Sequence, residues 1–291
     1  MSMDAANYIS TLELIAPRTT APENYDFAIL DLASDETLLE QLYSGTVGER
    51  IEWWSLFEGT SWQPDWASGP ILIDLRDAPG FRTQLQLQLE SSSMGILITS
   101  GSSAEELRQH LTRWLFESLP KKQQLLRFYE PRMFAPLLCV LSKQSCQNFL
   151  AVGRQWYWHD GHVWRESQGC NQPADELRDS GQVVVSATEL KNSERYWLAG
   201  EASGYATYYD EALGHTKRPA VWVFNCLEEA QKAGFLSAAY LERWLRLALQ
   251  LGADFHHSEP YQEALSRDDL SPRDRLIAME SMSEKAHANN S

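Results

Sequence analysis

Residues 124–134 read QLLRFYEPRMF, a stretch in which apolar side chains alternate with two arginines and a glutamate. The apolar residues in its first half indicate a strand that enters a core. Pro131 indicates the beginning of a helix, because proline fits the first helical turn. We therefore predict a strand over 123–130 and a helix over 131–142, with the charged side chains at their junction.

These charged side chains have two interpretations. In a strand, Arg127 points away from its neighbours, and a carboxylate at another strand end, Asp31 or Asp74, is its expected partner. Glu130 is placed to accept from the first free amides of the helix, and Arg132 is free to bind Glu130 or another molecule. The group either fixes the junction structurally or forms a binding site. Its members are Arg127, Tyr129, Glu130, Pro131 and Arg132.

Outward from this junction, predicted strands and helices alternate from about residue 25 to about residue 150. The strands are YDFAILDLAS (25–34), GPILIDL (69–75) and MGILITS (94–100), and the helices include ETLLEQLYS (36–44) and AEELRQHLTRWLFESL (104–119). FRTQLQLQLES (81–91) suits a strand or a helix, and the aromatic stretch 49–62 is predicted to be irregular. Residues 151–167 indicate a hairpin with Asp160-Gly161 at its turn. The pattern predicts an α/β lobe, a mixed sheet with helices against it.

The second half of the chain has a different pattern. Residues 171–182, NQPADELRDSGQ, are polar and typical of a linker. Apolar residues then recur at helical spacing, and Gly234 and Gly252 are placed to end two helices. We predict an α/β domain over 1–175 and a smaller all-α lobe over 182–291.

Composition and charge limit the classes of function that this chain is expected to have. The 291 residues are 43% hydrophobic and 11% aromatic, and the net charge is −15 from 40 acidic and 25 basic residues. Such a charge repels nucleic acid and anionic lipid. No apolar run approaches the ~18 residues of a membrane span, and the N-terminus lacks the pattern of a secretory signal. The four cysteines form no CxxC pair, so we expect reduced thiols and a cytoplasmic protein.

Motifs for catalysis and cofactors are missing from the sequence. It contains no GxxxxGK[ST], no GxGxxG and no GxSxG. His159 and His162 flank the predicted Asp-Gly turn without a third ligand at a suitable spacing. We expect no catalytic, metal or cofactor site and no small-molecule ligand. A hydrolase that uses acidic residues at strand ends, and an acidic immunity protein, are the alternatives to a binding protein.

Several segments resemble one bacterial family in the same order along the chain. The segment LLRFYEPRMFAPLL (125–138) resembles the central motif of the type VI secretion adaptors, or effector chaperones (the Tap/Tec proteins). Supporting resemblances are YDFAILDLA (25–33), WWSLFEGTSW (53–62), GPILIDL (69–75) and GILITSGSSAEELRQHLTRWL (95–115). Together they cover about residues 25–158. Glu130 replaces the aspartate usual in the family, and Ile71 stands where tyrosine is common.

The resemblance implies a non-enzymatic adaptor. Members of this family bind the N-terminal region of an effector and load it onto the spike protein, and they join an α/β lobe to a variable helical lobe that helps to select cargo. We expect the exposed members of an aromatic set to anchor the cargo, with the acidic surface steering a basic segment. At least three of the set are expected in the core. The set is Trp53, Trp54, Phe57, Trp62 and Trp66.

Overall fold

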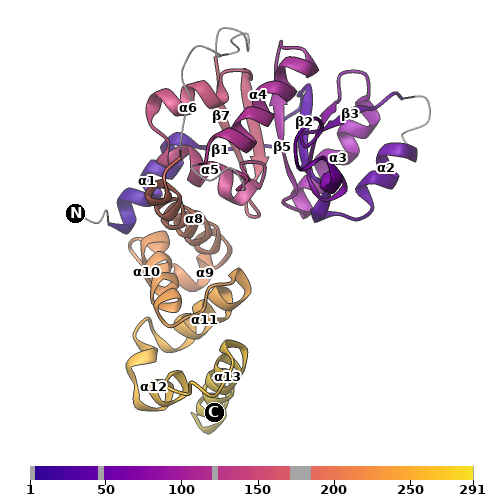
Figure 1. Cartoon of the computed structure of the whole chain (residues 1–291). Coiled ribbons are helices and arrows are strands. Elements are labelled where there is room, and N and C mark those ends of the chain that lie inside the picture. The colour runs from indigo at the N-terminus through magenta and orange to yellow at the C-terminus, as the bar shows by residue number, and fades with distance from the viewer. Residues whose placement is uncertain (1–3, 45–48, 120–123, 171–184, 291) are drawn as a thin grey trace. The chain divides into compact units, whose positions relative to one another are not determined.

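The computed structural model describes residues 4–44, 49–119, 124–170 and 185–290, without side chains for 286–290. The chain forms two compact units. One is Ser10–Trp197, and the other is Leu198–Ser291 together with Met1–Ile9. The predicted linker over 171–182 lies outside the described residues. An α/β sheet unit and a helical unit are both present (Figure 1), so the predicted fold class is confirmed.

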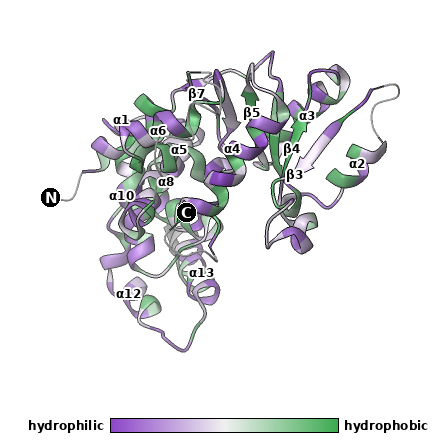
Figure 2. Cartoon of the chain, turned by 45° about the horizontal axis from the view of Figure 1, so that its top comes forward, coloured by the Kyte–Doolittle hydropathy of each residue, from purple (hydrophilic) through white to green (hydrophobic). Residues whose placement is uncertain are grey.

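The Ser10–Trp197 unit is built on a seven-stranded sheet in the order β1-β7-β6-β5-β2-β4-β3, and every pairing between these strands is antiparallel. The strands are β1 (Arg18–Thr19), β2 (Phe27–Asp31), β3 (Glu52–Ser55), β4 (Pro70–Asp74), β5 (Gly95–Thr99), β6 (Gln155–His159) and β7 (Trp164–Gln168). All five residues of β2 are buried, as expected for a strand covered on both faces. Figure 2 shows green, hydrophobic segments on the central strands.

Helices cover both faces of this sheet. They are α2 (Leu38–Ser44), α3 (Pro79–Ser91), α4 (Ala104–Glu117), α5 (Pro131–Val140) and α6 (Lys143–Leu150), with short 3₁₀ turns at Leu32–Ser34 and Gln63–Ser68. A further helix, α1 (Ala5–Ile15), is divided between the two units, because Met1–Ile9 belongs to the second. Leu30 of β2 packs in one core cluster with Phe81 and Leu85 of α3. On the other face, Trp156 of β6 packs against Phe134 of α5, with ring centroids 5.6 Å apart. This split follows the alternation of side chains along a strand.

Local signals placed most of these elements correctly. The ambiguous segment 81–91 is helical, because Phe81, Leu85 and Leu89 fall on one buried face while Leu87 is 64% exposed. Ser103 and Glu106 form a capping box at the beginning of α4, a signal that is readable from the sequence. The sequence prediction missed α1 and α6, and it missed β3 inside the stretch expected to be irregular.

The predicted strand over 123–130 is wrong for 124–130, the part of it that lies within the described residues. Amides of this segment bond to α4 and within the segment instead of joining the sheet. The Leu126 amide donates to the Leu115 carbonyl at 3.0 Å, and the Phe128 amide donates to Leu126 at 2.7 Å. A turn at Phe128 and Tyr129 follows, and α5 begins at Pro131 as predicted. Leu126, Phe128 and Tyr129 are buried in the core without a strand partner, and Leu125 is half-buried.

A buried ion-pair group fastens the N-terminal segment to the β6–β7 hairpin. Arg165 is 1% exposed and donates to the Asp160 carboxylate at the hairpin turn. Its Nη1 also lies 2.8 Å from the Ala16 carbonyl, and its Nη2 lies 3.4 Å from Glu13. Gly161 follows in the predicted turn with a φ of +99°, where glycine is favoured.

The second unit is helical. Its elements are α8 (Ala187–Tyr208, which begins in the first unit), α9 (Asp210–Leu213), α10 (Pro219–Lys232), α11 (Ala238–Leu251), a 3₁₀ turn at Phe255–His257, α12 (Glu259–Leu265) and α13 (Pro272–Asn290). Trp244 is fully buried and packs against Phe235 and Phe255 at centroid distances of 5.5 and 4.9 Å. Gly234 and Gly252 follow α10 and α11 with φ values of +89° and +96°, as predicted for helix ends.

Candidate functional site

The arginine motif, Arg127–Arg132, is held in place by its aromatic residues. Phe128 and Tyr129 are 1% and 3% exposed. The Phe128 ring lies 5.2 Å from the Phe149 ring of α6 and 6.0 Å from the Tyr129 ring. These buried rings fix the segment between α4 and α5, so the charged side chains beside them have defined positions.

Arg127 pairs with Asp31, which was one of its two predicted partners. Nη2 of Arg127 lies 3.1 Å from Oδ2 of Asp31, and the two side chains are 56% and 8% exposed. The other carboxyl oxygen of Asp31 accepts from the Ala33 amide at 3.1 Å. The guanidinium also lies 5.6 Å from the centroid of the Tyr129 ring. Burial raises the pKa of the Tyr129 hydroxyl, with smaller opposing effects from Arg127, so this tyrosine stays neutral at physiological pH.

Glu130 and Arg132 do not act as predicted. Glu130 occupies the N-cap position of α5, but its carboxylate makes no capping hydrogen bond, so the predicted cap is wrong. Glu130 is half-buried and Arg132 is exposed. Within the described ranges, neither side chain takes part in a hydrogen bond or an ion pair. The charged end of the motif is therefore not used to hold the described fold together.

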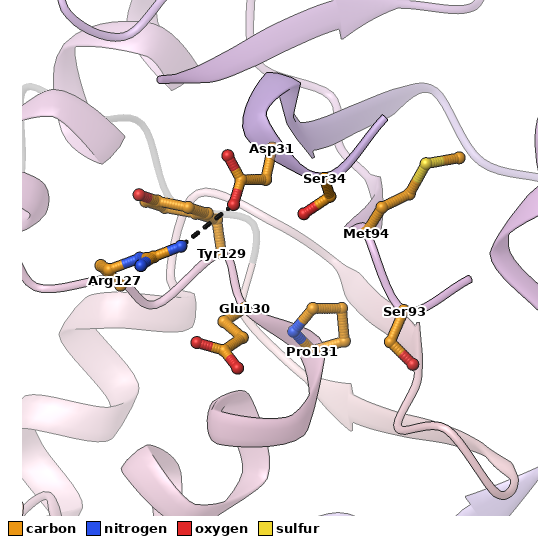
Figure 3. Close-up of a pocket in the computed structure, with 8 residues that line it drawn as sticks. All are labelled: Asp31, Ser34, Ser93, Met94, Arg127, Tyr129, Glu130 and Pro131. Carbon is orange, nitrogen blue, oxygen red and sulfur yellow. Dashed lines mark hydrogen bonds and ion pairs between the residues drawn. The ribbon is translucent and has the colours of Figure 1, made fainter. Parts of the chain in front are cut away.

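Two adjoining hollows open beside the motif, with volumes of about 230 and 410 Å³. Ser34, Ser93 and Glu130 line both of them. The smaller hollow is also lined by Asp31, Met94, Arg127, Tyr129 and Pro131, and the larger by Glu90, Ser91, Ser92, Arg132 and Gly161. Figure 3 shows the Arg127–Asp31 pair at one side of the smaller hollow and the Glu130 carboxylate turned away from that pair.

The larger hollow brings together four segments distant in the sequence. These are the turn after β2 at Ser34, the end of α3 at Ser91, the beginning of α5 at Glu130 and Arg132, and the hairpin turn at Gly161. A β-carbon at Gly161 would lie 3.2 Å from Nε of Arg132, so the arginine packs closely over the turn. The sequence prediction missed the serines and Gly161, although three consecutive serines between a helix and a strand are visible in the sequence.

The predicted aromatic anchors lie elsewhere in the first unit. Phe57 is 3% exposed, and the four tryptophans are half-buried. Trp53 stacks on Trp66 at 5.8 Å, and Phe57 lies 5.9 Å from Trp62. None of the five residues, Trp54 included, lines either hollow. The structure therefore does not join this aromatic set and the arginine motif into one site.

The chemistry of the two hollows suits recognition by charge and hydrogen bonding. Their lining residues provide three carboxylates, two guanidinium groups and four serine hydroxyls, but no histidine or cysteine. Among the described residues, no group of three or more His, Cys, Asp or Glu side chains could hold a metal ion. The thiols are free; Cys226 is buried, Cys139 and Cys146 are partly buried, and Cys170 is exposed. No described helix has the length and hydropathy that crossing a bilayer requires.

Comparisons with known proteins give one result. No curated protein matches the chain, and no solved structure matches it. The matching family model runs from the first residue of β2 into α6, and it includes the whole arginine motif and the serines that line the hollows. Residues 27–148 of this chain, somewhat less than half of it, match the family described as "Domain of unknown function (DUF4123)".

Proposed function

We propose that this protein is a cytoplasmic adaptor that binds the N-terminal region of a type VI secretion effector and loads it onto the spike protein. The matched residues 27–148 fall inside the span, about residues 25–158, that resembles the type VI adaptors. The proposal concerns a binding role without catalysis.

The proposal rests on two charged side chains of the motif that do not contribute a bond to the described fold. Glu130 and Arg132 border open hollows, and their side chains make no hydrogen bond or ion pair within the described part of the chain. A charged group that helps to hold a fold is normally paired. Side chains that keep their charge at a hollow without such a bond are available to a partner. This arrangement favours the binding interpretation for the charged end of the motif.

Arg127 has a different role. Its pair with Asp31 joins the end of β2 to the motif, so this half of the motif supports the architecture beneath the hollows. The motif therefore combines the two interpretations that the sequence left open, a structural contact at Arg127 and binding groups at Glu130 and Arg132.

The helical unit is proposed to help select the cargo. Tyr208, Leu236 and Ile277 of this unit are large hydrophobic residues with exposed fractions of 78%, 68% and 43%. Exposed aromatic and aliphatic side chains of this kind are frequent in protein-binding surfaces.

Co-purification tests the proposal. The full-length chain, tagged and expressed at its native level, is captured with the proteins encoded beside it, and these are identified by mass spectrometry. Recovery of an effector together with a spike component is the expected result. Recovery of neither under conditions that keep the chain folded would reject the adaptor role, and a hydrolase that uses acidic residues would then be tested by activity assays.

A further inference from the structure

The two hollows present opposite charges at separate places. Glu130 lies at their shared boundary, and Arg132 lines the larger hollow. Arg127 and Asp31 line the smaller hollow but compensate each other at 3.1 Å. Glu90 also lines the larger hollow, where it accepts a hydrogen bond from Nε1 of Trp164 at 3.2 Å. Glu130 and Arg132, two residues apart at the beginning of α5, are the charged lining side chains that make no hydrogen bond or ion pair with the described residues.

Serine hydroxyls accompany these charges. Ser34, Ser92 and Ser93 line the hollows, and in the described residues their hydroxyl groups make no hydrogen bond with the protein. Hydroxyls both donate and accept, so they suit the amides and carbonyls of a peptide backbone.

The balance of charge disfavours a phosphorylated ligand. The lining includes Asp31, Glu90 and Glu130 against two arginines. A phosphate that approached Arg132 would meet the carboxylate of Glu130, which lines the same hollow, and like charges at close range repel. A ligand with both a positive and a negative group satisfies both residues.

We propose that the two hollows bind a peptide segment that places a lysine or arginine against Glu130 and an aspartate or glutamate against Arg132, with its backbone bonded to the serines. This inference deepens the proposed function and rests on it for the identity of the partner, the secreted effector. Arg–carboxylate pairing adds geometric specificity as well as affinity. The oppositely charged pair would therefore determine which segment of the effector is recognised.

A random 12-residue peptide library displayed on phage, panned against the full chain, tests this inference without a known effector. Enriched peptides are synthesised, and their dissociation constants are measured by fluorescence anisotropy. We expect them to carry a basic and an acidic residue close together. Glu130→Gln and Arg132→Gln should each weaken binding tenfold or more. The matched controls Glu23→Gln and Lys143→Gln change exposed charges that line neither hollow, and they should leave the affinity unchanged.

Reversal of the charges gives the decisive comparison. A second peptide is made in which the two charged residues of the original peptide have changed places. The double variant Glu130→Lys/Arg132→Glu should bind this second peptide at least tenfold more tightly than the original one. Circular dichroism confirms that each variant is folded. No enrichment, enriched peptides without a charge pair, or equal binding to all variants would overturn the inference.

The peptide-binding test and the co-purification can fail independently of each other. If the peptides behave as expected but no effector or spike protein is recovered, the charge-pair site stands and the adaptor role falls. If an effector is recovered and the Glu130→Gln and Arg132→Gln variants bind it undiminished, the adaptor role stands and the charge-pair site is wrong.

Discussion

The guanidinium of Arg127 donates to the carboxylate of Asp31 across 96 residues of sequence, with Nη2 3.1 Å from Oδ2. The pair joins the end of the central strand β2 to the segment before α5. Arg127 therefore supports the fold, whereas the Glu130 and Arg132 side chains line the hollows without a bond to the described residues.

The Arg127–Asp31 pair is expected to contribute modestly to stability. Because the Arg127 side chain is 56% exposed, water screens the pair, and the coupling between Arg127→Gln and Asp31→Asn should be about 0.5–1 kcal/mol. Urea unfolding of the two single variants and the double variant measures it. Arg50→Gln, at an ion pair in which Arg50 is 84% exposed, is the matched control. A coupling above about 3 kcal/mol would instead indicate a buried pair.

Arg165 should behave very differently from Arg127. Its side chain is 2% exposed and its partner Asp160 is 10% exposed. Although burial alone raises the pKa of Asp160, Arg165 and the amides of Val163 and His162 hold it below its ordinary value. Arg165→Met leaves this carboxylate buried without its positively charged partner and should reduce the free energy of unfolding by about 3–5 kcal/mol.

Urea unfolding followed by tryptophan fluorescence measures this loss. Arg154→Met, which removes an exposed arginine next to β6, should cost less than about 0.5 kcal/mol. If the two variants were equally stable, the buried ion pair would have no role in holding residues 13–19 to the hairpin.

Stability should fall in mild acid because of His110. Burial lowers the pKa of His110 to about 4 from an ordinary 6.5, despite the hydrogen bond between Nε2 and the Phe149 carbonyl. Since the folded pKa is depressed for a base, the unfolded chain takes up the proton first as the pH falls. The neutral His110 ring therefore contributes to the free energy of unfolding in full above pH 6.5, and this contribution is lost as the pH falls toward 4.

The expected loss from this histidine is about 2.5 kcal/mol between about pH 7.5 and about pH 4.5. The free energy of unfolding measured across this interval should depend less steeply on pH for His110→Asn than for the unchanged chain. The exposed His215 is the control, and His215→Asn should retain the full dependence. An unchanged slope for His110→Asn would show that the ring is already charged in the folded protein.

Glu130 and Arg132 should affect binding without affecting stability. Because neither side chain bonds to the described part of the protein, Glu130→Gln and Arg132→Gln should each change the free energy of unfolding by less than about 0.5 kcal/mol. Capture of the effector by these variants should fall. Melting temperatures and pull-down yields measured on the same preparations check both effects. A large loss of stability with undiminished capture per folded molecule would assign the two residues to the architecture.

Several elements follow from local sequence signals. The apolar runs at β2, β4 and β5, the helical period of α4 and its Ser103–Glu106 capping box were all recognisable. So was the Asp160-Gly161 turn between β6 and β7. Each depends on residues close together in the chain, so periodicity and turn chemistry were sufficient to predict them.

The candidate site could be predicted in part. The sequence singled out the motif and gave Asp31 as one of two partners for Arg127, because a charged residue beside a core requires compensation. It also assigned a cap to Glu130, which the structure does not form. Ser91–Ser93 and Gly161 were not predicted as neighbours of Arg132, since their approach depends on how α3 and the hairpin pack.

By itself, the sequence determined the α/β and helical halves, most of the helices and strands, and the position of the arginine motif. Only the tertiary structure decided that residues 124–130 stay outside the sheet and that β3 pairs with β4 at its edge. It also decided that the Glu130 and Arg132 side chains line a hollow without a hydrogen bond or ion pair to the described residues. Local periodicity is encoded within a few residues. Strand pairing and the approach of distant side chains depend on the packing of the whole unit, which competes with local preference and here outweighs it at residues 124–130.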